Sequence, residues 1–124
     1  MTEELTVTTE RVDDMPLWLA QSEMMGIADL LDNYFKPHGN WEGTSLGWTT
    51  VVWLAHILED ADHRMNQVQG WVAHRPQTLH VCTGQQVQDR WWSDDRLALV
   101  LDALAQPEQW QGFETALNQR LIRV

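Results

Sequence analysis

The chain has little positive charge. Eight Lys and Arg residues stand against eighteen Asp and Glu residues, which gives a formal net charge of −10 over 124 residues. A domain that holds DNA through its phosphate groups normally presents a basic patch. The composition therefore disfavours DNA binding by this chain alone and leaves open only a local patch of Arg64, Arg75 and Arg90.

The acidity is unevenly distributed along the chain. Residues 1–36 carry eight acidic residues against Arg11 and Lys36, a balance of −6, whereas residues 37–92 and 93–124 each carry five acids against three cations, a balance of −2 each. A polyanion is repelled most strongly by the first third. This part of the chain is therefore better suited to contact a protein than to contact DNA.

Cysteines and long apolar runs are also scarce. Cys82 is the one cysteine, so no internal disulfide is expected. The longest apolar run, Ser45 to Leu58, has about 14 residues, and a membrane-spanning helix needs roughly 20. The first ten residues are acidic and lack the basic and apolar segments of a signal peptide. We therefore expect a soluble, cytoplasmic protein without a membrane partner.

Apolar residues at helical spacing predict an all-α fold, a compact bundle of about six short helices with short connections. Residues 1–12 are expected to form a flexible or extended lead, and residues 13–124 a single helical domain. The expected helices run from Pro16 to Met25, from Ile27 to about Phe35, from the Ser45 cap to about Ala61, from Met65 to Ala73, from the Ser93 cap onward, and from Pro107 to near the end of the chain. The stretch from Gln77 to Val87, which Gly84 interrupts, has only weak helical character.

Helix boundaries are marked by residues that suit them. Asp13 or Asp14 is expected to cap the first helix and Gly26 to end it. Ser45 and Ser93 are expected to cap two later helices. The helix after Ser45 is apolar nearly all round, which predicts that it lies at the centre of the fold.

Eight tryptophans are many for this length. Most lie on apolar helical stripes, which predicts core packing, and base stacking would require cationic grooves that the chain lacks. The exceptions are Trp41, in a glycine-rich loop, and the adjacent Trp91 and Trp92, which cannot both face one core. Together with Arg64, these three tryptophans are the candidate interaction residues.

One constellation suggests a metal. His56, Asp60 and His63 lie at i, i+4 and i+7, so they share a face if the helix continues, and two imidazoles with a carboxylate suit zinc. The helix is expected to end near Ala61, which breaks this alignment. We therefore assign no metal and no other cofactor, and keep a metal-dependent hydrolase as an alternative.

Catalytic groupings are not recognisable in the sequence. There is no GxGxxG, no phosphate-binding loop and no CxxC, and nothing places His80 and Cys82 in a cleft. We therefore expect that the chain alone is not an enzyme.

Four strings stand out beyond their helical pattern: ERVDDMPL at 10–17, MGIADLLD at 25–32, PHGNWEG at 37–43 and DHRMN at 62–66. Together they resemble the N-terminal region of a group of insertion-sequence transposases, over residues 10–124. In such transposases an RNase H-like domain with an Asp-Asp-Glu triad follows, and no residue here matches that triad. The resemblance implies a non-catalytic accessory domain that acts in assembly, dimerisation or recognition of transposon ends, with the catalytic domain or a second copy as partner.

A function of a different class also fits the charge. A small acidic domain could act as a stand-alone inhibitor or DNA mimic that occupies a basic groove on another protein. That role requires carboxylates gathered on one face, which a sequence does not show.

Overall fold

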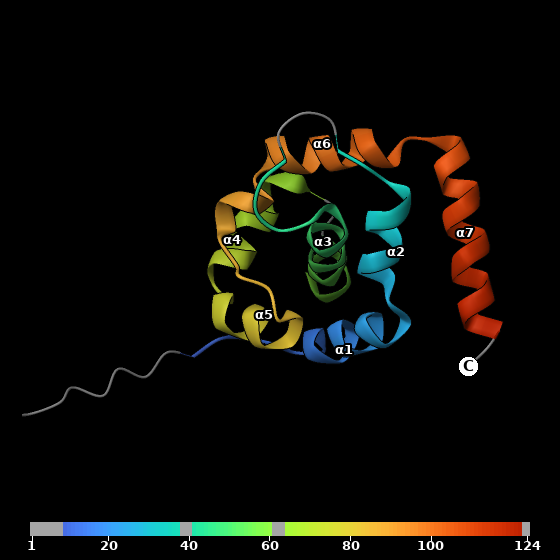
Figure 1. The fold of residues 1–124 in the computed structure, drawn as a ribbon. Coiled ribbons are helices and arrows are strands. Elements are labelled where there is room, and N and C mark those ends of the chain that lie inside the picture. Colours follow the sequence, from blue (N-terminus) through green and yellow to red (C-terminus); the bar gives the residue numbers. More distant parts are fainter. Residues whose placement is uncertain (1–8, 38–40, 61–63, 123–124) are drawn as a thin grey trace, which may run out of the picture.

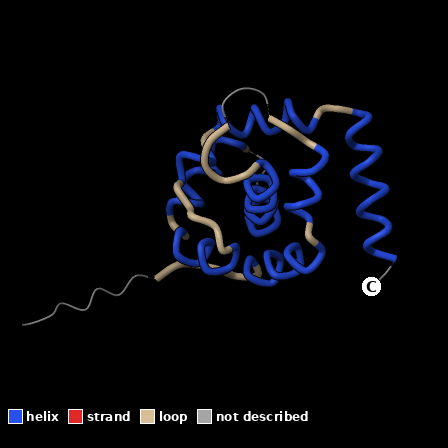
Figure 2. Tube along the Cα trace, in the orientation of Figure 1, coloured by secondary structure: helices blue, strands red, loops and turns tan. Residues whose placement is uncertain are grey.

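The computed structural model describes residues 9–37, 41–60 and 64–122. Within these residues the chain is helical and without strands, as Figure 2 shows, and the all-α prediction is confirmed. The helices are α1 (Met15–Met25), α2 (Ile27–Tyr34), α3 (Leu46–Asp60), α4 (Val68–Ala73), α5 (Pro76–Thr83), α6 (Asp94–Leu104) and α7 (Pro107–Ile122), with short 3₁₀ helices η1 (Met65–Gln67) and η2 (Asp89–Trp92). Most of the expected lead, residues 1–8, lies outside the described residues.

Helix α3 is the centre of the bundle. Figure 1 shows it end-on, with α1, α2, α4, α5 and α6 arranged around it. Its buried residues point in all directions and include Val51, Val52 and Trp53, as expected for a helix that is apolar nearly all round. Within the described part of the chain, no helix is long and apolar enough to cross a membrane.

Most of the predicted helix boundaries are confirmed by the backbone. Gly26 takes a left-handed conformation, with φ of 65°, between α1 and α2. The Ser45 and Ser93 hydroxyls accept hydrogen bonds from the amides of Trp48 and Arg96, at 3.2 and 3.3 Å. These two serines satisfy amide donors that the first turn of a helix leaves free.

The predicted cap of α1 is wrong in its chemistry. Asp14 occupies the N-cap position, but its side chain makes no capping hydrogen bond. Asp13 has a left-handed backbone, with φ of 42°, and its carboxylate accepts a hydrogen bond from Arg11 Nε at 2.7 Å. The helix therefore begins without a side-chain cap.

Helix α5 corrects the prediction for the stretch from Gln77 to Val87. It begins at Pro76 and ends at Gly84, whose φ is 69°. The Glu10 carboxylate accepts hydrogen bonds from the first free amides of this helix, on Gln77 at 3.2 Å and on Thr78 at 2.8 Å. This cap comes from more than sixty residues away, so local patterning could not reveal it.

The tryptophans belong to the core, as predicted. Trp53, Trp71 and Trp92 are buried, and the other five are half-buried against the same cluster. The prediction that Trp92 lies at an interface is wrong, because this side chain is 0% exposed and its Nε1 donates to the Thr49 carbonyl at 3.1 Å. Of the adjacent pair, only Trp91 reaches the surface.

Candidate binding groove

A groove of about 790 Å³ lies between α1 and α3. This volume falls within the range of sites that bind drug-sized ligands or segments of a partner. Its lining comes from the turn before α1, from the first two turns of α1 and from the last two turns of α3: Asp13, Asp14, Met15, Leu17, Trp18, Gln21, Ala55, Leu58 and Glu59.

The rim of the groove is apolar and open to solvent. Leu17 on α1 is 71% exposed and Leu58 on α3 is 64% exposed. Met24, seven residues after Leu17 and so on the same face of α1, is exposed as well. Single exposed leucines are common on protein surfaces, but leucines on both sides of one groove form a surface that a partner can cover.

One end of the groove, where Asp13, Asp14 and Glu59 lie, is acidic. This is the acidic end. Asp13 and Asp14 are exposed there, whereas the side chain of Glu59 is only 3% exposed. Neither Glu59 oxygen has a hydrogen-bond donor among the described residues. Burial raises the pKa of Glu59, the Arg75 guanidinium opposes this rise, and the neighbouring Asp13 carboxyl adds to it.

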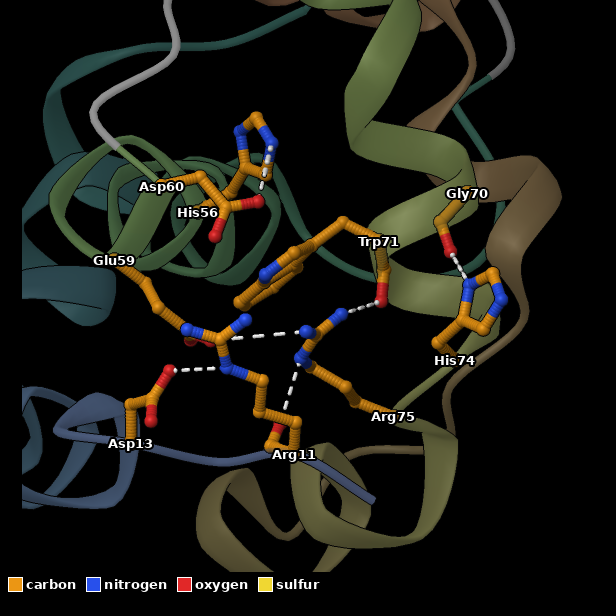
Figure 3. Close-up of polar contacts among 9 residues, drawn as sticks. All are labelled: Arg11, Asp13, His56, Glu59, Asp60, Gly70, Trp71, His74 and Arg75. Carbon is orange, nitrogen blue, oxygen red and sulfur yellow. Dashed lines mark hydrogen bonds and ion pairs between the residues drawn. The ribbon is translucent and has the colours of Figure 1, made fainter. Parts of the chain in front are cut away.

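Arg75 forms an ion pair with Glu59, but two of its N–H donors bind backbone carbonyls. Its Nε donates to the Arg11 carbonyl at 2.8 Å and its Nη1 to the Trp71 carbonyl at 2.7 Å, as Figure 3 shows. Its guanidinium carbon lies 4.6 Å from the centre of the Trp71 ring. Arg75 Nη2 lies 3.6 Å from Glu59 Oε1, which is an ion-pair contact but is too long for a good hydrogen bond.

Arg11 completes this network from the segment before α1. Its Nε donates to the Asp13 carboxylate at 2.7 Å, as Figure 3 shows. Asp13 above all, and then Glu59, raises the pKa of Arg11. The acidic end keeps a surplus of one negative charge, because among the described residues the carboxylates of Asp13, Asp14 and Glu59 lie beside only these two guanidinium groups, of Arg11 and Arg75.

The predicted metal ligands lie beside this network. His56 is buried, its Nε2 is 3.7 Å from Asp60 Oδ2, and its ring meets the ring of Trp71 edge-on at 5.4 Å (Figure 3). His63 lies outside the described residues. Among the residues that are described, no three His, Cys, Asp or Glu side chains are grouped as a metal site would require.

The remaining candidate interaction residues lie away from the groove. The Arg96 guanidinium carbon lies 3.7 Å from the centre of the Trp41 ring, and both side chains donate a hydrogen bond to the Thr44 carbonyl. Trp91 packs so closely on Gly43 that a Cβ there would be 2.2 Å from its ring. These contacts hold the segment that leads into α3, and an interface role for Trp41 and Trp91 stays a prediction.

The possible cationic patch does not form as a surface feature. Arg75 is buried and its guanidinium is bonded to backbone carbonyls, whereas Arg64 and Arg90 are exposed. The interaction role of Arg64 stays a prediction.

Sequence patterning did not find the groove or the role of Glu59. One signal was present, because Glu59 and Asp60 are the two acidic residues at the end of a helix whose earlier positions are mostly apolar. Comparison with protein-family models, curated proteins and solved structures gave no match.

Proposed function

We propose that this chain is a non-catalytic assembly domain that docks a protein partner in the groove between α1 and α3. The resemblance to transposase N-terminal regions suggests the partner, an RNase H-like catalytic domain of a transposase. A domain that handles DNA needs a basic surface to hold phosphates. This chain has a net charge of −10 and an acidic groove end, so its charge is complementary to the basic surface of such a domain.

The observation that carries this proposal is the pairing of an apolar rim with an acidic end in one groove. A bound partner would bury the exposed apolar surface of Leu17 and Leu58. Burial of apolar surface contributes a favourable free energy of roughly 25 cal/mol per Å². Asp13 and Asp14 add charges that orient the partner and exclude others. Protein-recognition surfaces likewise combine apolar and polar contacts.

The positions of the other acidic residues favour docking over DNA mimicry. A DNA mimic needs carboxylates gathered on one face. Here the exposed acids include Glu23 on α1, Asp95 and Asp102 on α6, and Glu114 on α7. These helices lie on different sides of α3 (Figure 1).

The test uses the double variant Leu17→Ser, Leu58→Ser, which changes only exposed side chains. Its affinity for a separately purified transposase catalytic domain is measured by isothermal titration calorimetry. Loss of two apolar contacts is expected to weaken binding by about tenfold or more. The matched control, Leu99→Ser with Leu101→Ser on α6, also changes two exposed leucines and is expected to bind like the unmodified chain.

The competing role in transposon-end recognition is tested in parallel. Labelled terminal inverted repeats are titrated with the chain at low salt, and an electrophoretic mobility shift is measured. Tight, sequence-selective DNA binding without binding of the catalytic domain would contradict the proposal.

A further inference from the structure

We propose that the acidic end of the groove is a receptor for one cationic side chain, a Lys or Arg that the partner carries on an apolar segment. Its charged group would lie beside Glu59 and Asp13. Its methylene stem would run along the apolar walls of the groove. The inference rests on the proposed docking function and specifies what the docked segment must contain.

Glu59 is the first reason. A carboxylate has about four lone-pair sites for hydrogen-bond donors, and burying one without donors is costly. The Glu59 side chain is almost wholly buried, lines the groove, and has no hydrogen-bond donor within the described structure. An ammonium or guanidinium group that entered the groove would supply N–H donors and a positive charge at this point.

The chain's own cations do not form a hydrogen bond with Glu59 among the described residues. The Nε and Nη1 groups of Arg75 donate to backbone carbonyls, and its Nη2 lies 3.6 Å from Glu59 Oε1. Arg11 donates through Nε to Asp13 rather than to Glu59. Three carboxylates, those of Asp13, Asp14 and Glu59, therefore lie beside two guanidinium groups, those of Arg11 and Arg75, which leaves one negative charge at the acidic end for a partner cation to balance.

The walls of the groove select the kind of cation. Leu17, Trp18 and Leu58 are apolar surfaces beside the acidic end. Lys and Arg place their methylene stems along such surfaces while the charged group reaches a polar partner. A hard metal ion prefers a shell of oxygen ligands and gains nothing from these walls. Leu17 and Leu58 are exposed at the rim, so the residues on either side of the Lys or Arg can pack against them. This favours a peptide segment over a small cation as the ligand.

The experiment uses two fluorescein-labelled amphipathic peptides of leucine and alanine, identical except for one central residue, which is Lys in the first and Gln in the second. Fluorescence anisotropy gives the dissociation constant of each peptide. The unmodified chain is expected to bind the Lys peptide about tenfold more tightly than the Gln peptide. Glu59→Gln is expected to reduce this preference to about twofold or less.

A charge-matched control separates the receptor from bulk electrostatics. Glu114→Gln makes the same change in net charge at an exposed position on α7, and it is expected to keep the tenfold preference. Circular dichroism checks that each variant is folded. If Glu59→Gln does not fold, Asp13→Asn serves in its place, because Asn tolerates the left-handed backbone at this position and removes the charge. It is expected to reduce the preference at least threefold.

The outcomes distinguish this inference from the proposed function. Equal affinity for the two peptides, or a Lys preference that survives Glu59→Gln, would overturn the cation receptor. If the catalytic domain still bound through Leu17 and Leu58 in that case, the docking function would stand. A Lys preference that depends on Glu59, with no binding of the catalytic domain, would support the receptor and overturn the proposed partner.

Discussion

At the scale of single residues, a close backbone approach places α3 against α2. A Cβ on Gly47 would lie 2.0 Å from the Ala28 carbonyl oxygen, so no side chain fits there. The Gly47 amide also donates to the Asp32 carboxylate at 2.7 Å. The position of the central helix, and with it the wall of the groove, therefore depends on one glycine.

Gly47→Ala is expected to lower the free energy of unfolding by about 1–3 kcal/mol, because an added methyl group forces the two helices apart. Denaturation in urea, followed by circular dichroism, measures the change. The matched control is Gly70→Ala on α4, where a Cβ would meet nothing within 4 Å. Alanine favours helix, so this control is expected to be neutral or to stabilise by up to about 1 kcal/mol. Equal stability of the two variants would contradict the close approach.

Glu59 predicts how stability depends on pH. Its pKa is raised in the folded chain, first of all by burial, so the folded state holds this proton more tightly than the unfolded state. The resulting stabilisation is fully present below the ordinary pKa of a glutamate and is lost as pH rises through the raised value. Glu59→Gln removes this pH-dependent stabilisation because an amide does not titrate.

The measurement compares urea denaturation of the unmodified chain and Glu59→Gln from pH 4.5 upward. The unmodified chain is expected to lose stability relative to the variant as pH rises. The titratable and charged neighbours of Glu59, namely Asp13, Asp60, Arg11 and Arg75, are the same in both proteins. Parallel pH profiles would show that Glu59 titrates normally.

At the scale of helices, the first turns are satisfied in different ways. Ser93 caps α6 with its own hydroxyl, whereas α5 receives its cap from Glu10, which is distant in sequence. These hydrogen bonds lower the pKa of Glu10, and they outweigh the desolvation that acts in the opposite direction. Asp14, at the start of α1, makes no capping bond. The three helix starts are therefore expected to respond differently to substitution.

Ser93→Ala is expected to lower the free energy of unfolding by about 1 kcal/mol, because it removes the acceptor for the Arg96 amide. Asp14→Ala is expected to change it by less than half as much, since no capping bond is lost. Chemical denaturation of both variants gives the comparison. A larger loss for Asp14→Ala would mean that the carboxylate stabilises α1 by another route.

At the scale of the whole molecule, α7 lies outside the shell around α3. Figure 1 shows it at the edge of the bundle, beside α2. Phe113 is its buried side chain within the described residues, and it packs on Phe35 and Trp110. Near its end, Arg120 Nη1 donates to the carbonyls of Met25 and Gly26. This helix is therefore attached chiefly through α2 and the residues that flank α2.

Amide hydrogen exchange is expected to show this difference in attachment. Amides of α7 should exchange about tenfold faster than those of α3, because local opening of a peripheral helix costs less than global unfolding. Arg120→Ala should speed exchange at the end of α7 and leave α3 unchanged. Equal protection of the two helices would indicate that α7 opens only when the whole domain unfolds.

The sequence by itself determined the helical class, most helix boundaries and the central place of α3. Gly26 and Ser93 act on backbone groups within a few residues, so their effects are readable from local order. The run of apolar residues in α3 likewise implies burial on most of its sides, although Leu54 and Leu58 remain exposed.

Only the tertiary structure decided that Trp92 is buried, that Glu10 starts α5, and that Glu59 faces a groove without donors. Each of these features depends on partners far apart in the chain, such as Trp92 with Thr49 or Glu59 with Arg75 and Asp13. The physical reason is that burial and charge pairing are properties of the packed helices. A local pattern specifies a helix, but it does not specify which carboxylate remains without a donor once the helices have packed.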